Sequence, residues 1–403
     1  MLDGVSASRL VRLAELARAF APLGLTSFGG PVAHFGYFHR AFVVRRSWFT
    51  QAQFTDLVAL CQFLPGPASS QFVFAAGLMR AGLPGGILAA FCFSAPSIAI
   101  MLAFAMGVTN STTLAHAGFV HGFKLAAVGV VAHAVLTMWR TLCPDLIRTA
   151  FALAACGAAI FAPAAWWQPV IIALAGLLGL ALLRPASPKA EQVDLLPQPH
   201  QLRRTYGAIS LSLFAVLFTL PHLLDSTRVE HHVVVFNAFY RSGALVFGGG
   251  HVVLPLLHER IVNPGWVNDD QFLAGYGMAQ AIPGPLFCFA AHLGAVIYPA
   301  SPITGGIAGT LAIFLPGWLL IAGVLPFWAS LKQSVRLQRI LTGFNASVVG
   351  ILLAALYRPL CTSTVHAAPD VAVTLTAFAV LALTRVPPIV VIALCGVAGQ
   401  YLI

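Results

Sequence analysis

Two short glycine clusters stand in the middle of apolar sequence and have the composition of an anion-binding site. The first reads FGGPVAH from Phe28, and the second reads FGGGHVV from Phe247. Each is followed by a Pro-Gly-Pro triplet, at 65–67 and at 283–285. Glycine and proline interrupt helices. The free N–H groups at the start of the next half-helix, together with the positive end of its dipole, can then bind an anion.

Hydroxyl, amide and cationic side chains accompany these breaks and would add donors and charge. Lys124 lies inside an apolar stretch, and Arg241 lies six residues before the second glycine cluster. The residues predicted to bind the anion are Phe28, Gly29, Gly30, Gln62, Pro65, Gly66, Pro67, Ser69, Ser70, Gln71, Lys124, Arg241, Phe247, Gly248, Gly249, Gly250, His251, Gln280, Pro283, Gly284 and Pro285. Two alternatives stay open: the glycines and prolines could serve only tight helix packing, and the two cations could reach out to the membrane interface.

Histidine is the natural proton carrier at neutral pH, and four histidines lie in or beside apolar segments: His34, His121, His133 and His251. His34 and His251 belong to the glycine clusters and are the predicted proton-coupling residues. Each histidine has the alternative role of a packing or interface residue. The seven cysteines are odd in number and include no Cys-x-x-Cys, so we predict neither a disulfide framework nor a metal site. No cofactor is expected.

The composition indicates a membrane protein with many helices. Of the 403 residues, 59% are hydrophobic and only 8% are charged, whereas a soluble domain carries about 25% charged residues. The net charge of +10 is scattered along the chain, which argues against a nucleic-acid partner and fits Lys and Arg gathered on cytoplasmic loops. The N-terminal residues carry no pattern of a removable signal. The expected fold is all-α, and the expected partner is the lipid bilayer.

The chain repeats itself. The two glycine clusters align, and with them Phe20, Gly24, Trp48, Phe54, Gln62, Gly85, Pro96, Gly122 and Gly129 align with Phe239, Gly243, Trp266, Phe272, Gln280, Gly305, Pro316, Gly343 and Gly350. Only small gaps are needed, so the chain consists of two homologous halves. The predicted domains are residues 1–183, a polar, proline-rich linker over 184–205, and residues 206–403, which begin with a linking helix at about 206–223.

Positive charge swaps between matching loops of the two halves. The loop 107–118 has no Lys or Arg, whereas its partner 331–339 has three; the loop 38–48 has three Arg residues, whereas its partner 257–266 has one. By the positive-inside rule the halves have opposite orientations. Inverted repeats are typical of secondary transporters, with the site near the bilayer midplane. Loops 38–48, 184–204 and 331–339 are predicted to be cytoplasmic, and 107–118 and 257–266 periplasmic.

Arginines on both sides of the first glycine cluster predict a re-entrant hairpin over residues 10–46, with FGGP at its tip. A second hairpin over 50–82 has LPGP at its tip, and half two has matching hairpins tipped by FGGG and IPGP. Four broken-helix tips would meet at the midplane. Full spans are predicted at about 84–107, 117–140, 148–163 and 167–184, and at 303–328, 339–358, 370–384 and 386–402. The alternative is a plain first span over 10–30 and five or six ordinary crossings per half.

The paired motifs resemble those of the chromate ion transporter family. Half one carries FGGPVAH, RRSWF and DLVALCQFLPGPASSQ, and half two carries FGGGHVVLPLL and GMAQAIPGPLFCFAA. The resemblance implies an exporter of cytoplasmic chromate, a tetrahedral dianion, in the inner membrane of a bacterium, with chromate resistance as the result. At Ala41-Phe42-Val43 the chain departs from the family pattern, because an acidic residue is expected before the valine; this departure bears on proton coupling.

Rival functions remain open at this point. Sulfate or another oxyanion would suit the same donors as chromate. A membrane enzyme would need a catalytic array at depth, and only Asp56 and Glu15 are candidates. A passive channel would show a charged ring or a filter motif, and no clear one is present. The sequence leaves the oligomeric state open, a homodimer included.

Overall fold

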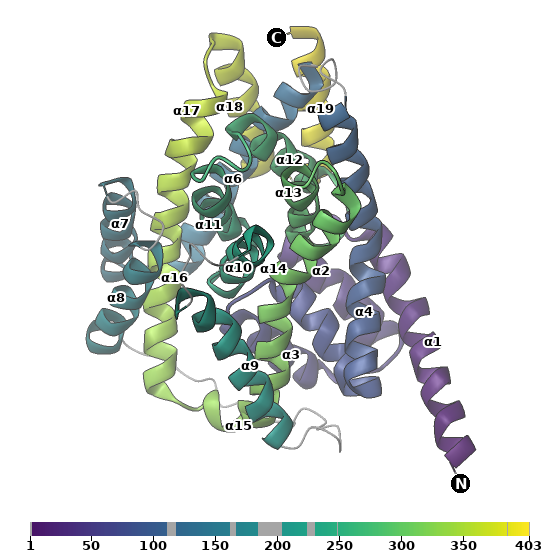
Figure 1. Ribbon diagram of the computed structural model, residues 1–403. Helices are drawn as coiled ribbons and strands as arrows, with labels where there is room; N and C mark the ends of the chain where they lie inside the picture. Colours follow the sequence, from purple (N-terminus) through teal and green to yellow (C-terminus); the bar gives the residue numbers. More distant parts are fainter. Residues whose placement is uncertain are drawn as a thin grey trace.

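A computed structural model describes residues 2–110, 118–161, 167–183, 204–223, 230–247, 249–384 and 386–402 (Figure 1). Within these ranges the secondary structure is helical throughout and includes no strand, as the sequence predicts. Residues 184–203 of the predicted linker lie outside the described residues, and so does Gly248.

The helices of the two halves follow the same order. Half one contains α1 (Leu2–Thr26), α2 (Gly30–His39), η1 (Arg40–Arg45), α3 (Gln51–Phe63), α4 (Ala68–Asn110), α6 (Gly118–Leu142), α7 (Leu146–Phe161) and α8 (Trp167–Leu182). After the linking helix α9 (Arg204–Leu223), half two contains α10 (His231–Ala244), η2 (Gly250–Val252), α11 (Val253–Leu257), η3 (His258–Val262), α12 (Asp269–Ala281), η4 (Leu286–Cys288), α13 (Phe289–Ile297), α14 (Pro302–Val324), η5 (Leu325–Phe327), α15 (Trp328–Leu331), α16 (Val335–Ala355), η6 (Leu356–Cys361), α17 (Thr362–Thr364), α18 (Ala368–Leu383) and α19 (Pro388–Leu402).

Helix α4 is two helices joined at a break. Ala81 and Gly82 leave helical geometry, and Gly82 has φ of 70°, which glycine adopts without a steric penalty. The arm before the break corresponds to α13, and the arm after it corresponds to α14. The break therefore takes the place of the short turn that separates α13 from α14 in half two.

Four stretches of helix are long and apolar enough to cross a bilayer: Ala68–Val108, Gly118–Leu142, Pro302–Leu331 and Val335–Thr364. They contain the predicted spans at 84–107, 303–328 and 339–358 and, from residue 118 onward, the span at 117–140. The other four predicted spans form α7, α8, α18 and α19, which are helices of only 15 or 16 residues. At about 1.5 Å per residue each is roughly 24 Å long, shorter than the hydrocarbon core of about 30 Å.

The two halves exchange their last helices. Helices α7 and α8 pack on α16 of half two, and α18 and α19 pack on α6 of half one (Figure 1). Glycines at matched positions allow both crossings. A side chain at Gly122 of α6 would collide with the Cys395 carbonyl, and one at Gly343 of α16 would collide with the Ala175 carbonyl. The repeat is thus expressed in packing as well as in sequence.

Two ion pairs show which helix ends share a face. Lys332, just before α16, bonds Asp56 of α3 at 3.0 Å, and Lys124, near the start of α6, bonds Asp270 at the start of α12 at 2.6 Å. In Figure 1, α3 and α15 lie in the lower part of the molecule, and α12 lies in the upper part. The equivalent helices α16 and α6 therefore begin on opposite faces, which confirms that the repeats are inverted relative to each other.

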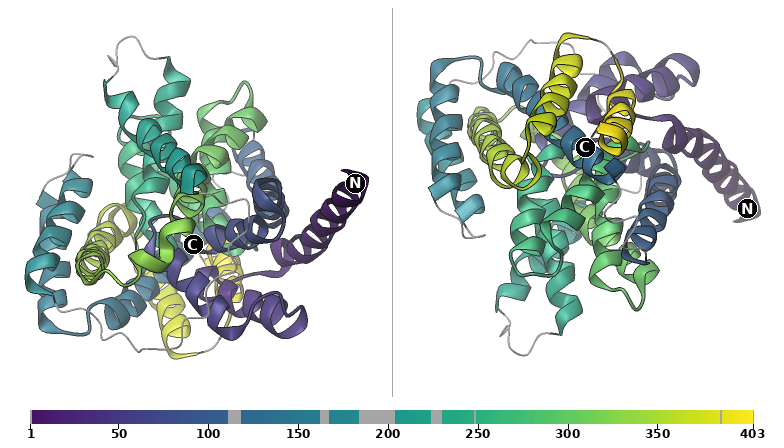
Figure 2. Two further views of the ribbon diagram at one scale, coloured as in Figure 1. Left: turned by 90° about the horizontal axis from the view of Figure 1, so that it is seen from below. Right: turned by 90° about the horizontal axis from the view of Figure 1, so that it is seen from above.

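The hairpins are also present. Helix α1 ends at Thr26, and the returning segment packs back against it, with Phe42 4.9 Å from Phe20 between ring centres. Arg80, at the end of the second hairpin, bonds Glu15 of α1 at 3.1 Å, so the bases of both hairpins share one face. Helix α1 extends away from the rest of the molecule in both views of Figure 2.

Candidate functional site

The tips of the hairpins meet through two crossed hydrogen bonds. Gly66 N–H of the half-one triplet donates to the Val246 carbonyl at 2.7 Å, and Gly284 N–H of the half-two triplet donates to the Ser27 carbonyl at 2.8 Å. Val246 and Ser27 each directly precede an FGG cluster, so the two bonds are equivalent under the repeat. Each half thus holds the other at its broken helices.

The tip glycines differ from the glycines of the helix crossings. Gly66 and Gly284 have φ of 128° and 87°, and Gly29 and Gly30 have φ of 95° and 74°, conformations that side chains with a Cβ rarely adopt. A Cβ on Gly30 would meet nothing within 4 Å. Packing therefore explains Gly122 and its like, but not the first glycine cluster.

The crossed bonds occupy two backbone N–H groups at the tips. The N–H groups of Gly66 and Gly284 are not free for an anion in this conformation, because each donates to a carbonyl of the other half. The first-turn N–H groups of α4, which lack a partner in their own helix by geometry, are the donors that remain beside the half-one triplet. A tip N–H becomes available only when a crossed bond opens.

The start of α4 places three predicted residues together. The helix begins at Ala68, directly after Pro67, as predicted, and Ser69, Ser70 and Gln71 are buried in its first turn. Gln71 Nε2 donates to the Pro65 carbonyl at 2.8 Å, and Trp318 Nε1 of α14 donates to Ser70 Oγ at 3.3 Å. The Gln71 Oε1 atom is buried without a partner in the described part of the chain.

The second triplet is followed by a different geometry. Leu286 begins a single 3₁₀ turn, η4, and α13 starts only at Phe289. Ser97 Oγ of α4 donates to the Pro283 carbonyl at 2.5 Å. Ser97 thus braces this triplet as Gln71 braces the first.

His251 carries a polar cluster at the second glycine cluster. Its Nδ1 lies 2.9 Å from Tyr276 Oη and 3.3 Å from Gln280 Nε2. A bare Nδ1 accepts from both groups, so the proton of the neutral ring is on Nε2. His251 is half-buried and Gly250 is buried. In half one the repeat equivalents of His251 and Tyr276 are Val32 and Val58, which are apolar, whereas Gln280 is matched by Gln62.

His34 is held differently. It is buried, and its Nε2 donates to the Ser27 carbonyl at 3.1 Å, the carbonyl that also accepts from Gly284. Its Nδ1 is buried without a partner within the described residues, and Phe93 packs edge-on against the ring. Protonation would bury a charge among apolar groups. His34 is therefore a neutral hydrogen-bond partner of the Ser27 carbonyl, beside the crossed bond from Gly284. This geometry disfavours the predicted proton coupling at His34.

The two predicted intramembrane cations do not reach the tips together. Lys124 pairs with Asp270, whose side chain is 73% exposed at the start of α12. That pair lies at the hairpin base of half two, so in this conformation Lys124 is held beside an acid and away from the tips, and its role in binding the anion stays a prediction. Arg241 is buried with its guanidinium 4.7 Å above the Phe218 ring of α9, and its Nε has no hydrogen-bond partner in the described part.

The other predicted residues divide between open and covered positions. Gly29 and Gln62 are exposed, and Phe28 is half-buried. Phe247 packs edge-on against Phe344 of α16 at 4.9 Å, and Gly249 faces Met138 of α6. The half-one tip is therefore the more accessible of the two.

Residues tied to the rival functions are accounted for by packing and ion pairs. Phe42, at the departure from the family pattern, is fully buried and stacks on Trp48 at 4.9 Å. The two acids proposed for an enzyme are both paired: Asp56 with Lys332 and Trp328, and Glu15 with Arg80. The predicted proton carrier His121 bonds Asp370 of α18 at 2.9 Å and links the halves.

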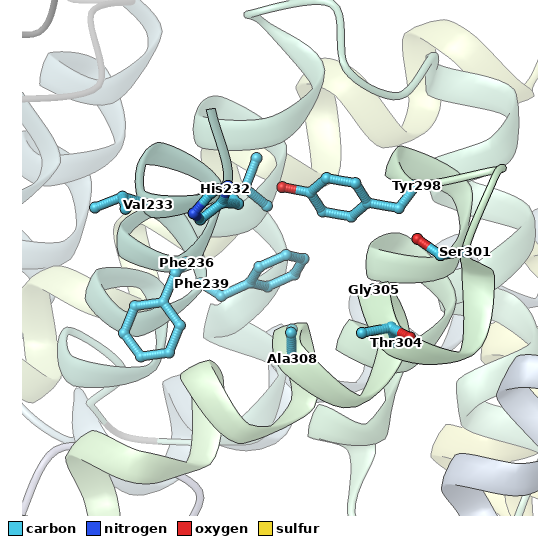
Figure 3. Close-up of a pocket in the computed structure, with 11 residues that line it drawn as sticks. His232, Val233, Phe236, Phe239, Tyr298, Ser301, Thr304, Gly305 and Ala308 are labelled. Atoms are coloured by element: carbon cyan, nitrogen blue, oxygen red, sulfur yellow. The ribbon is translucent and has the colours of Figure 1, made fainter. Parts of the chain in front are cut away.

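A hollow of about 380 Å³ lies between α10 and α14 at the base of the half-two hairpins (Figure 3). Phe236, Phe239 and Tyr298 form its aromatic walls, and Ser301 and Thr304 line it at the start of α14. None of the predicted anion-binding residues lines it, and its lining carries no acid, lysine or arginine.

Sequence reasoning missed several residues at the tips: Ser27, Ser97, Val246, Tyr276 and Trp318. Two of them act through backbone carbonyls, which no side-chain pattern marks. The position directly before each FGG cluster was the available signal, because it recurs in both halves. The Ser97 and Trp318 contacts come from the α4 and α14 spans, distant in sequence.

Comparisons with known proteins agree with the repeated architecture. The sequence model of a family described as chromate transporter matches residues 14–180 and 233–400. A chromate transport protein of Pseudomonas aeruginosa is 29% identical over 402 residues, covering 96% of this chain and 91% of the relative. A probable chromate transport protein of Synechococcus elongatus is 25% identical, covering 85% and 83%. A chromate transport protein of Cupriavidus metallidurans is 26% identical, covering 85% and 81%. No solved structure matches the chain.

Proposed function

Because the chain belongs to the chromate transporter family, we propose that it is a secondary transporter that carries chromate out of the cytoplasm and thereby gives resistance. The observation that carries the proposal is the family match over both halves. The crossed bonds between the four tips support it, since inverted repeats that meet at broken helices are the architecture of alternating-access carriers.

The crossed bonds suggest how the path opens. A hydrogen bond of this kind contributes about 0.5–1.5 kcal/mol net, so opening one of them costs little. Breaking the Gly66 bond to Val246 would free a tip N–H beside the first turn of α4, where Ser69 and Ser70 lie. The donor would thus become available to the oxyanion at the moment the path opens. The same holds for Gly284 when the other half moves.

Residue roles follow from these positions. We assign the oxyanion to the two triplets, the accessible first glycine cluster and the first turn of α4. His251, with its Nε2–H free of the Tyr276 and Gln280 bonds, is the proposed donor from half two and the proposed proton carrier. Arg241 supplies positive potential from α10 without an acid paired to it in the described part of the chain.

The membrane potential favours export. Moving one charge across 100 mV is worth about 2.3 kcal/mol, so outward movement of a dianion gains about 4.6 kcal/mol in a cell with a negative interior. That free energy alone sustains a gradient on the order of 10³. Import would need at least three coupled cations. Export therefore requires no nucleotide site, and the sequence contains no P-loop.

The finer parts of the proposal concern substrate and place. Sulfate has the shape and charge of chromate and is the alternative substrate. The plasma membrane of a bacterium is the proposed location, and a homodimer remains a prediction.

Uptake of labelled chromate and labelled sulfate into inverted membrane vesicles tests the proposal. We expect chromate to accumulate faster when the vesicle lumen is made positive, without added nucleotide. Sulfate accumulation in preference to chromate would reassign the substrate. Uptake that ignores an imposed potential would remove the electrogenic mechanism, and chemical conversion of chromate without uptake would favour an enzyme.

A further inference from the structure

A second hollow lies at the base of the half-one hairpins and gathers positive charge. Its volume is about 460 Å³, and it is lined by Glu15 and Arg18 of α1, by Arg46, Ser47 and Trp48 after η1, and by Arg80 before the α4 break. We call it the arginine hollow. It contains three guanidinium groups and one carboxylate, and none of its residues belongs to the predicted anion site at the tips.

Two of the three guanidinium groups lie against one aromatic ring. Arg80 lies 4.3 Å above the Trp48 ring and bonds Glu15 at 3.1 Å, and Arg46 lies 5.9 Å from the same ring. Stacking on an aromatic face orients a guanidinium and reduces the entropy lost when it binds. Ser47 between them has φ of 48°, and it is the one non-glycine residue with positive φ in the described ranges.

Charge in the hollow is not balanced. Glu15 pairs with Arg80, while Arg18 and Arg46 form no ion pair within 4 Å in the part of the chain that the structure describes. The Arg80 Nε atom is buried and has no hydrogen-bond partner there. Guanidinium groups bind carboxylate, phosphate and similar oxyanions through two parallel N–H bonds. Two unpaired forks beside a third can hold one tetrahedral dianion.

The hollow is connected to the tips by one helix. From Arg18 to Ser27 along α1 is nine residues, or about 14 Å at 1.5 Å per residue. Ser27 is the residue whose carbonyl accepts the crossed bond from Gly284. At the repeat-equivalent positions half two has Asn237, Pro264 and Tyr298 in place of Arg18, Arg46 and Arg80, and Tyr298 lines the neighbouring aromatic hollow (Figure 3). Three arginines are therefore not a requirement of the repeat's fold.

We propose that the arginine hollow is a capture site for tetrahedral dianionic oxyanions, which holds them at the half-one face before they reach the tips. The inference rests on the proposed function for the identity of the oxyanion. A phosphate headgroup of an anionic lipid has the same chemistry, and the experiment separates the two sources.

The transport test compares Arg18→Gln/Arg46→Gln with Arg45→Gln in inverted vesicles. Arg45 is exposed like Arg46 but does not line the hollow, so it controls for the loss of a positive surface charge beside the hollow. We expect the double variant to raise the KM for chromate about tenfold, with a maximal rate within about twofold of the parent protein. Arg45→Gln should change KM less than about twofold, and KM should rise steeply with salt in the parent and in Arg45→Gln, which keep the hollow, but not in the double variant. An equal rise in both variants, or no rise in either, overturns the capture site.

A binding test needs no transport. Purified full-length protein is placed in phosphatidylcholine nanodiscs, with or without phosphatidylglycerol, and equilibrium binding of labelled chromate is measured. Weaker chromate binding in the double variant supports the capture site even if vesicles transport no chromate. A lack of transport would reject only the proposed function. If the double variant loses retained phosphatidylglycerol and binds chromate unchanged, the hollow is a lipid site and the proposal fails. Labelling of a single cysteine, introduced by Val335→Cys in a background without the seven native cysteines, verifies that the variants keep their orientation.

Discussion

At the base of the half-one hairpins, Trp48 contacts the guanidinium groups of Arg80 and Arg46. At the matching place in half two, Trp266 contacts His231 at 5.3 Å, and His231 in turn contacts Tyr298 at 6.1 Å. The tips of the two halves, by contrast, make the same crossed hydrogen bond in both directions. The two halves thus make the same contacts where they meet, and different contacts where each half faces its own side of the membrane.

This difference separates two requirements of a carrier. Tips that must open in alternation need equivalent geometry, because each uses the other's carbonyl. Faces need no such equivalence, and unlike charge at the two faces makes the approach of an anion unequal. We infer that the tips set the mechanism of opening, and the faces set the side on which an oxyanion is captured.

The largest expected effect is at the tips. Gly66→Leu and Gly284→Leu should each reduce chromate transport by at least about 100-fold, roughly 2.7 kcal/mol, with the protein still inserted. Both glycines have positive φ, and a Cβ would press on Gln71 at Gly66 and on Ser97 at Gly284. Transport assays and membrane fractionation measure the two outcomes.

The two tip variants should lose transport to the same extent, because their crossed bonds are equivalent. Gly36→Leu is the control, because a Cβ there meets nothing within 4 Å, and it should transport normally. A tip variant that behaves like the control would show that its crossed bond is dispensable. The two halves would then be equivalent in helix packing but not in the function of their tips.

A smaller effect is expected from exchanging the faces. Arg80→Tyr should raise the KM for chromate on the half-one face by about tenfold, because the arginine hollow loses a guanidinium. Tyr298→Arg should lower the KM on the opposite face, since its hollow gains one. Vesicles of both orientations measure the two constants. An unchanged KM on both faces in Arg80→Tyr/Tyr298→Arg would show that the charge of a face does not determine where the oxyanion is captured.

The half-two cluster gives a moderate prediction. Tyr276→Phe removes the O–H that His251 Nδ1 accepts at 2.9 Å, so the imidazole is less well oriented. We expect transport to fall about fivefold to tenfold, equal to one lost hydrogen bond of about 1 kcal/mol or slightly more. Tyr298→Phe is the matched control, because its hydroxyl has no partner in the described chain. Equal rates in the two variants would remove the His251 cluster from the mechanism.

Much of the fold could be predicted from the sequence because glycine, proline and arginine residues mark the repeat. Matched glycines fixed the alignment, and the swap of arginines between loops such as 38–48 and 257–266 predicted the inversion. The lengths of α7 and α19 were predicted to within two residues, by the spans at about 148–163 and 386–402. The exchange of these helices between halves depends on contacts such as Gly122 with Cys395, which lie far apart in sequence.

The site was harder to predict because its key groups belong to the backbone. The Gly66 and Gly284 positions were correctly expected at the tips, but the carbonyls that satisfy them could not be seen in residue types. Charge was the other difficulty. Lys124 lies in an apolar run, and only the structure places Asp270 beside it.

The smallest expected effect concerns that ion pair. Sequence position alone predicts that Lys124→Gln strongly weakens transport and Lys124→Arg weakens it less, with the lysine supplying potential to the site. The structure instead pairs Lys124 with an Asp270 that is 73% exposed, and exposed pairs contribute about 0.2–1 kcal/mol.

We therefore expect Lys124→Gln to change the chromate transport rate less than about fivefold, the value that 1 kcal/mol allows. Asp270→Asn should have the same effect, because either change removes the same pair. The charge reversal Lys124→Asp/Asp270→Lys should restore the loss, since it rebuilds the pair at the base of α12. A loss of 100-fold in Lys124→Gln that Asp270→Asn does not reproduce would instead place the lysine in the path of the anion, in a conformation where it has left Asp270.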